Sequence, residues 1–175
     1  LNSAWTNHFA DFIFPILTAL HRGPLAVNVG APLLAVIWIY FGRKQAAKTI
    51  LFMAFSVIVS DFVSYSVIKL NIQRDRPEKV LSGVVLRSPS HSGYSFPSNH
   101  AANITAAAVT VRYYFPALRS LAFIVTILVS YSRIYVGVHF PLDVIAGMAV
   151  GAACAFLVIN INNRLARLFS RNGKD

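Results

Sequence analysis

The sequence contains a single cysteine, Cys154, which lies in an apolar stretch. One cysteine excludes a disulfide framework within the chain and a metal site built from several thiolates, and we interpret Cys154 as a small buried side chain. Linkers, low-complexity segments and internal repeats are also absent, so the length of 175 residues predicts one domain over residues 1–175. Residues 1–20 lack a basic start and a small-residue cleavage site, and we expect no cleavable signal peptide.

Acidic side chains are scarce: six Asp and Glu stand against sixteen Lys and Arg, for a formal net charge of +10. Hydrophobic residues make up 56% of the chain and mean hydropathy is +0.59. In a soluble protein this excess of positive charge would suggest a nucleic-acid partner. Because the apolar runs are long, we expect no nucleic acid, and instead a membrane with an anionic lipid or a lipid phosphate as partner.

Five apolar segments have the length that a membrane-spanning helix needs, at a rise of about 1.5 Å per residue. They lie at about 25–42, 49–68, 98–115, 120–138 and 141–161. A sixth, weaker segment at 3–20 contains His8, Asp11 and Pro15, so it either spans with partners or lies in the interface. The pattern predicts an all-α fold, an integral membrane bundle of about six helices.

Positive side chains gather in connections and in a tail that would share one side of the membrane: Arg43, Lys44, Lys48, Arg112, Arg119, Arg164, Arg167, Arg171 and Lys174. The positive-inside bias places that side in the cytoplasm. Three polar stretches, 69–76, 97–100 and 133–143, then share the outer side. Cations also lie on that side, and their clustering around the three stretches indicates that some of them bind a ligand.

The first stretch holds Lys69 and Arg76, which are seven positions apart and share a face if the helix continues past the membrane. Pro77 favours an exit from the helix soon afterwards. Arginine offers a planar fork for phosphate oxygens and lysine a compact charge. Two cations at a membrane end are more often headgroup anchors, so both roles stay open for this stretch alone.

The second stretch begins with Pro97, which is suited to open a helix with Ser98 and Asn99 in its first turn. Free N–H groups at a helix start bind anions. The Ser98 hydroxyl adds a donor, and His100 can supply a proton to a leaving oxygen. A capped helix with an interfacial histidine explains the same four residues equally well.

In the third stretch His139 and Asp143 are four positions apart and face the same way on a helix. A carboxylate on one ring nitrogen fixes the tautomer and leaves the other nitrogen free to attack. Arg133 can stabilise charge on a transferring phosphoryl group. A His–Asp pair alone is weak evidence, but its place on the same predicted face as the other stretches favours an enzymatic site.

A metal is the weaker alternative for these residues. The two histidines and Asp143 could coordinate an ion, but the neighbouring Lys69, Arg76 and Arg133 would repel it. Side-chain cations can replace a metal in phosphate chemistry, so we predict a site without metal and without cofactor.

Three further residues lie inside the apolar segments. Asp61 is an intramembrane acid, which makes it a functional candidate by default, and we interpret it as structural, bonding a neighbouring helix near the site. Gly147 and Gly151, four positions apart, predict close packing between helices.

The three stretches follow one pattern: Lys, six residues and Arg-Pro; then Pro-Ser-x-His; then Ser-Arg, five residues, His, three residues and Asp. Ten positions carry it in order: Lys69, Arg76, Pro77, Pro97, Ser98, His100, Ser132, Arg133, His139 and Asp143. In this pattern the chain resembles the type-2 phosphatidic acid phosphatase superfamily. The motifs lie within 69–143, and the helical pattern extends the likeness over nearly the whole chain.

The resemblance implies a metal-independent phosphatase in a bundle of six helices. It implies that His139 attacks phosphorus to form a phosphohistidine, that Asp143 orients His139, and that His100 protonates the leaving group and then activates water. It also implies a set of phosphate ligands: Lys69, Arg76, Ser98, Arg133 and the backbone N–H of Asn99. Asn99 replaces the family's usual glycine, which lets a backbone approach a ligand closely, although helical Asn99 still presents its N–H.

The same superfamily includes soluble vanadium haloperoxidases. The predicted membrane-spanning segments argue against that branch for this chain. The resemblance implies a bacterial lipid phosphatase similar to those for undecaprenyl diphosphate, phosphatidylglycerophosphate or lipid A 1-phosphate. It places the enzyme in the cytoplasmic (inner) membrane with its site facing the periplasm or the cell exterior. A lipid phosphotransferase and a non-catalytic lipid-phosphate binder are the alternatives, but binding alone would not need the His139–Asp143 pair.

Overall fold

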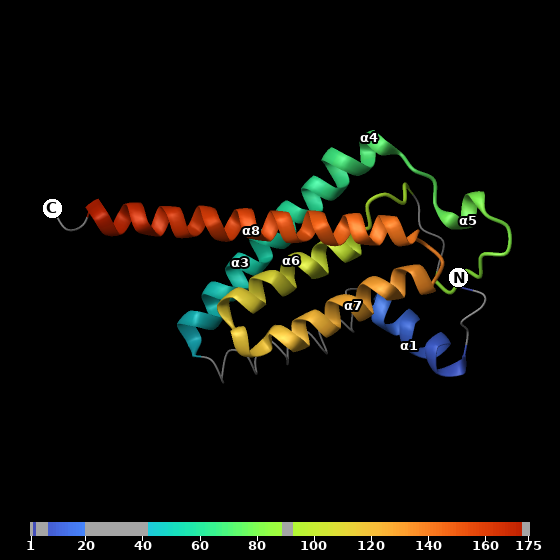
Figure 1. The fold of residues 1–175 in the computed structure, drawn as a ribbon, viewed down its shortest axis with the longest axis horizontal. Helices are drawn as coiled ribbons and strands as arrows, with labels where there is room; N and C mark the ends of the chain where they lie inside the picture. Colours follow the sequence, from blue (N-terminus) through green and yellow to red (C-terminus); the bar gives the residue numbers. More distant parts are fainter. Residues whose placement is uncertain (1, 3–6, 20–41, 89–92, 173–175) are drawn as a thin grey trace.

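A computed structural model describes residues 2, 7–19, 42–88 and 93–172 of the chain. Five long helices account for most of these residues (Figure 1): α1 His8–Ala19, α3 Arg43–Phe62, α6 Asn99–Tyr114, α7 Arg119–Tyr135 and α8 Pro141–Asn172. The described residues contain no strand, which confirms the all-α prediction. The segment predicted at 25–42 lies outside the described residues.

Three described helical stretches are long and apolar enough to cross a membrane: Arg43–Val80, Pro116–Tyr135 and Pro141–Ser170. The segment predicted at 98–115 is helical, but α6 has only 16 residues, and it lies at the centre of the bundle. The weak segment at 3–20 forms the short helix α1, with Pro15 inside it.

The helix that begins at Arg43 continues beyond α3 through a π-helical stretch, Val63–Lys69, into α4, Leu70–Ile72. It ends at Gln73, whose φ of +52° is left-handed. The chain is extended at Arg76 before the short helix α5, Pro77–Val80. Lys69 and Arg76 were expected to share a helical face only if the helix continued past Lys69 to Arg76, and it ends between them at Gln73.

Helix α6 is the centre of the bundle and packs against α3, α7 and α8, while α1 packs on α7 (Figure 1). The predicted close packing at Gly147 and Gly151 is confirmed. A Cβ at Gly147 would overlap the backbone of Ser98, and one at Gly151 would overlap that of Ala102. The two glycines thus let α8 lie directly against α6.

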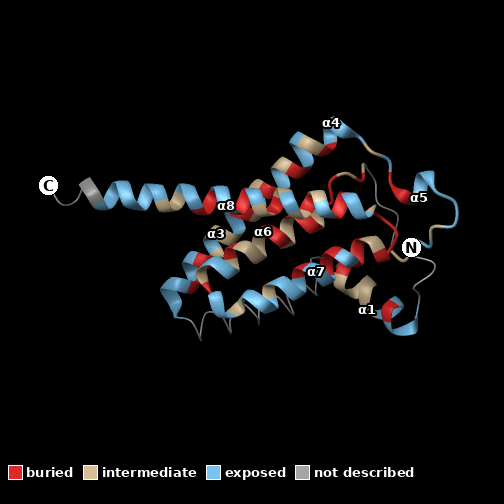
Figure 2. Cartoon of the chain, viewed as in Figure 1, coloured by how far each residue is buried: buried red, intermediate tan, exposed pale blue. Residues whose placement is uncertain are grey.

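Buried residues follow α6 and the faces of its neighbours, whereas the outer faces of the helices are exposed (Figure 2). Many of the exposed side chains are large and apolar: Phe55, Ile58, Phe62, Phe123, Ile145 and Phe156. Such a surface suits hydrocarbon rather than water. Cys154 is buried, as predicted.

Candidate active site

One cavity of about 380 Å³ brings the three polar stretches together. Six of the predicted site residues line it, namely Lys69, Arg76, Asn99, His100, Arg133 and His139. They come from the end of the π-helical stretch, the extended residue before α5, the start of α6, the end of α7 and the turn before α8. The cavity therefore brings together residues up to seventy positions apart in the chain. The sequence pattern predicts that these residues share one site.

His139 lines this cavity, and the buried Asp143 lies behind it. The turn that carries His139 is made possible by Gly137, whose φ is +85°. His139 Nδ1 lies 3.7 Å from Asp143 Oδ2, which is longer than a hydrogen bond. Nδ1 is the nitrogen on the carboxylate side, so Nε2 is the nitrogen left for attack.

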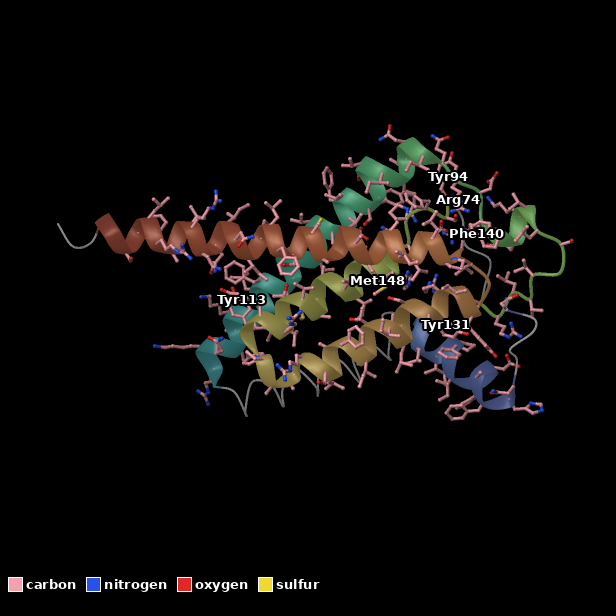
Figure 3. The ribbon with its side chains drawn as sticks, viewed as in Figure 1. Arg74, Tyr94, Tyr113, Tyr131, Phe140 and Met148 are labelled. Atoms are coloured by element: carbon pink, nitrogen blue, oxygen red, sulfur yellow. The ribbon has the colours of Figure 1, made fainter. Side chains whose placement is uncertain are left out.

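Asp143 is fully buried and is held by residues that sequence reasoning missed. Arg74 Nη1 lies 2.8 Å from Oδ1, while Ser95 Oγ and the Phe140 N–H each donate to Oδ2 at 2.9 Å. Figure 3 shows Arg74 and Phe140 together near the start of α8, where the guanidinium lies 4.1 Å from the ring centre. Arg74 belongs to the basic stretch 69–76, but nothing in the pattern distinguished it or Ser95.

The buried cations at the cavity are fixed by uncharged oxygens. Lys69 Nζ donates to the Tyr94 carbonyl at 3.3 Å, and Arg76 donates to the carbonyls of Gly93 and Val138 at 3.2 and 3.0 Å. Within the described part of the chain neither Lys69 nor Arg76 forms an ion pair. Buried positive charge without a carboxylate partner favours the entry of an anion.

Arg133 is the most deeply buried of these cations, with 1% of its surface exposed. Its guanidinium donates to the Thr18 hydroxyl of α1. Sequence reasoning missed Thr18, because the partner lies 115 positions away along the chain.

Ser98 occupies a different position from the predicted one. Helix α6 begins at Asn99, so Ser98 is the N-cap, and its hydroxyl accepts from the Ala101 N–H at 3.5 Å. The Ser98 N–H donates to the Asp143 carbonyl at 2.9 Å. Pro97 therefore precedes the helix instead of opening it. The backbone hydrogen bond from Ser98 to Asp143 links the start of α6 to the start of α8.

Electrostatics keep the His139 ring neutral. Burial, together with the positive charges of Arg133, Arg76 and Lys69, lowers the pKa of His139 from 6.5 to about 4, while Asp143 acts in the opposite direction. At neutral pH the imidazole is unprotonated and able to act as a nucleophile.

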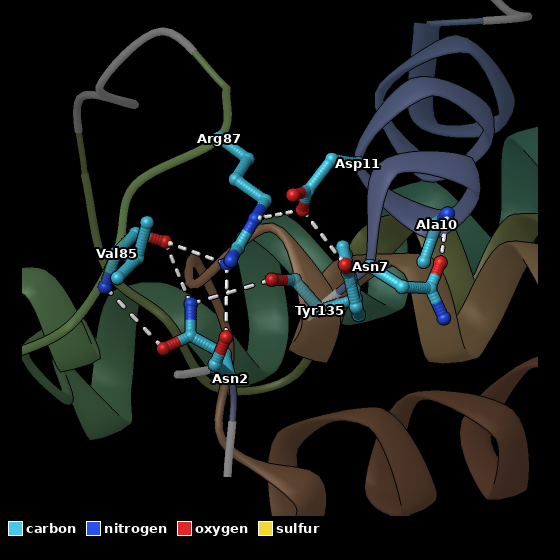
Figure 4. Close-up of polar contacts among 7 residues, drawn as sticks. All are labelled: Asn2, Asn7, Ala10, Asp11, Val85, Arg87 and Tyr135. Atoms are coloured by element: carbon cyan, nitrogen blue, oxygen red, sulfur yellow. Dashed lines mark hydrogen bonds and ion pairs between the residues drawn. The ribbon is translucent and has the colours of Figure 1, made fainter. Parts of the chain in front are cut away.

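Helix α1 is held against the site by a polar network (Figure 4). Asp11 Oδ1 accepts from Arg87 Nε at 2.5 Å and from the Tyr135 hydroxyl at 2.7 Å. Asn2 Nδ2 donates to the Val85 carbonyl at 2.6 Å. The network joins α1, the 81–88 loop and the end of α7, and so keeps α1 beside Arg133.

The described part of the bundle contains two further cavities. One of about 550 Å³ shares Asn99 and His100 with the cavity described above and is otherwise largely apolar. The other, of about 760 Å³, lies among α6, α7 and α8 toward Arg112 and Arg119 and contains none of the predicted site residues. Within the described residues no three His, Cys, Asp or Glu side chains come together as a metal-binding group.

The fold and the cavity define an integral membrane helical protein with a cluster of cations and histidines at one end of the bundle. The chain belongs to the PAP2 superfamily, whose sequence profile matches residues 49–167.

Several known proteins are similar to it. It is 34% identical over 122 residues to the undecaprenyl-diphosphatase of Sulfolobus acidocaldarius, covering 69% of this chain and 57% of that protein. It is 27% identical over 178 residues to phosphatidylglycerophosphatase B of Bacillus subtilis, covering 95% and 80%. The crystal structure of Aquifex aeolicus LpxE matches with a TM-score of 0.74 and 28% identity over 91% of this chain and 90% of that one.

Proposed function

We propose that the protein hydrolyses a phosphate or diphosphate group on a membrane lipid through a phosphohistidine intermediate, without metal or cofactor. The observation that carries the proposal is the placement of neutral His139, backed by Asp143, in one cavity with His100 and three buried cations. We also propose that residues 1–175 act as one domain.

In the first step the cations hold the phosphate oxygens. Lys69, Arg76 and Arg133 supply the charge, and the Asn99 N–H and the Ser98 hydroxyl add donors at the start of α6. His139 Nε2 attacks phosphorus, the bond to the lipid oxygen breaks, and His100 gives that oxygen a proton. Asp143 stabilises the positive charge that forms on the His139 ring.

In the second step water replaces the lipid. His100, now unprotonated, takes a proton from water as the oxygen attacks phosphorus. The phosphorus–Nε2 bond breaks and inorganic phosphate leaves, which restores both rings.

The named relatives support a lipid substrate, because they are an undecaprenyl-diphosphatase and a phosphatidylglycerophosphatase. The apolar cavity beside His100 supports a leaving group that carries a lipid chain. Undecaprenyl diphosphate, phosphatidylglycerophosphate and lipid A 1-phosphate are the substrate classes to compare. The charge pattern supports a cytoplasmic-membrane enzyme with its cavity on the outer face.

The test is release of inorganic phosphate by the purified protein from each of these lipids, in detergent with a chelator present. We expect release by the unaltered protein and a loss of at least about a thousandfold in His139→Ala. In isotope-labelled water the label should appear in the released phosphate, which a phosphotransferase would not give as its main reaction. An unaltered rate in His139→Ala would contradict the proposal.

A further inference from the structure

Asp61 forms a polar cluster with two asparagines of the neighbouring helix. Its Oδ1 accepts from Nδ2 of Asn99 and from Nδ2 of Asn103, both at 2.9 Å. The predicted bond from Asp61 to a neighbouring helix is therefore confirmed. Because an ionised carboxylate only accepts hydrogen bonds, both amides must turn their NH₂ groups toward Asp61 and their oxygens elsewhere.

The cluster lies in the wall of the 550 Å³ cavity, whose remaining lining is largely apolar. Asn99 and His100 line both this cavity and the one that holds the cations. A lipid phosphate bound by the cations, with its ester oxygen toward His100, would extend its leaving group into the second cavity. The first polar groups it meets there are those of the Asp61 cluster.

In this cluster both amide Nδ2 atoms donate to Asp61, whereas the two amide oxygens find no donor among the described residues. The Oδ1 atoms of Asn99 and Asn103 are buried and accept no hydrogen bond within the described part of the chain. Neighbouring atoms cover the two amide oxygens, whereas the Asp61 side chain is exposed and is the acceptor that an entering group reaches.

We propose that Asp61, Asn99 and Asn103 form a subsite that binds a hydroxyl, or another hydrogen-bond donor, of the lipid leaving group beside the scissile ester. The inference rests on the proposed function and deepens it by naming the substrate class. A lipid phosphate monoester with a free hydroxyl next to the ester carbon supplies a donor to the exposed Asp61 carboxylate. A diphosphate instead places a second negative group beside Asp61, and this repulsion selects against it.

The test compares three lipids on the full chain in detergent: phosphatidylglycerophosphate, which has such a hydroxyl, its analogue with that hydroxyl replaced by hydrogen, and undecaprenyl diphosphate. We expect kcat/KM of the unaltered protein to fall about tenfold on loss of the hydroxyl, as for one hydrogen bond to a charged group. We expect the diphosphate to be the poorer substrate as well.

The informative variant is Asp61→Asn, which keeps the shape and removes the charge. It should reduce the preference for the hydroxyl lipid over its deoxy analogue to less than about threefold and raise turnover of the diphosphate. Asn103→Leu should reduce the same preference. Asp75→Asn, an exposed acid outside both cavities, is the matched control and should leave all three rates unchanged.

Two outcomes overturn the subsite. In one, the unaltered protein hydrolyses the three lipids with equal kcat/KM. In the other, Asp61→Asn lowers all three rates by the same factor, which is the result expected if Asp61 only holds α3 against α6. Phosphate release from any one lipid keeps the proposed function intact in both cases, whereas no release from any of them contradicts that function and this inference together.

Discussion

At the scale of single residues, the properties of His139 are set by its neighbours. Burial and three cations keep its ring neutral, and Asp143 lies behind it at 3.7 Å. Asp143 in turn is fixed by Arg74, Ser95 and the Phe140 backbone.

The first prediction concerns Arg74, a positioning residue for Asp143. Arg74→Ala should lower kcat by about ten- to a hundredfold with little change in KM, because a carboxylate shifted by a fraction of an ångström misorients His139. Steady-state kinetics on a lipid phosphate measures this. Lys79→Ala, an exposed cation of α5, is the control, and equal effects of both variants would contradict the role of Arg74.

The second prediction concerns pH. Because the pKa of His139 is lowered to about 4, the ring should remain unprotonated as pH falls through 6.5 and gain its proton only near pH 4. Histidine-labelled NMR of the ligand-free protein, with His139→Gln used to assign the signal, measures the titration. A His139 midpoint near the ordinary 6.5 would show that the ring is not shielded as described.

At the scale of elements, the glycines of α8 decide how closely the central helices pack. Gly151→Ala places a methyl group on the Ala102 backbone. Since α6 and α8 must then separate, we expect a loss of about 1–3 kcal/mol in the free energy of unfolding and reduced activity, because Ser98 is bonded to Asp143 across the same interface. Thermal unfolding in detergent measures the change.

The control for this prediction is Ala153→Leu, on the exposed face of α8. It adds a larger side chain to the same helix without meeting α6. If Ala153→Leu destabilised the protein as much as Gly151→Ala, the contact between the two helices would not be the cause.

Sequence reasoning found the elements and the residues that carry a motif, since apolar length and fixed spacing are local properties. It placed Lys69, His100 and His139 on one face, and they do line one cavity. It missed Arg74, Ser95 and Thr18, because their roles depend on where the chain turns back. The left-handed turn at Gln73 ends the helix and directs Arg74 and Arg76 to the site by a path that helical spacing cannot predict.

At the scale of the whole molecule, the two ends of the bundle differ in their charged residues and in the presence of the site. The cavity with the cations lies at one end, and the C-terminal part of α8, whose sequence includes Arg164 and Arg167, extends toward the other (Figure 1). We propose from the positive-inside bias that the second end faces the cytoplasm. This orientation can be tested directly, because the chain has one cysteine and it is buried.

The fourth prediction uses that cysteine. In a Cys154→Ser background, Lys79→Cys should react with a membrane-impermeant thiol reagent added to intact cells, and Ser170→Cys should react only after the membrane is opened. Both positions are exposed. The reverse pattern of labelling would place the cavity on the cytoplasmic face.

The central claim is that His139 carries the phosphoryl group between lipid and water. Mixing the protein with a radiolabelled lipid phosphate and quenching in alkali within milliseconds should trap label on the protein. Mass spectrometry of the digested protein should then find phosphate on the peptide that contains His139, and none in His139→Ala. Release of phosphate with no label on that peptide, at any quench time, would contradict the account.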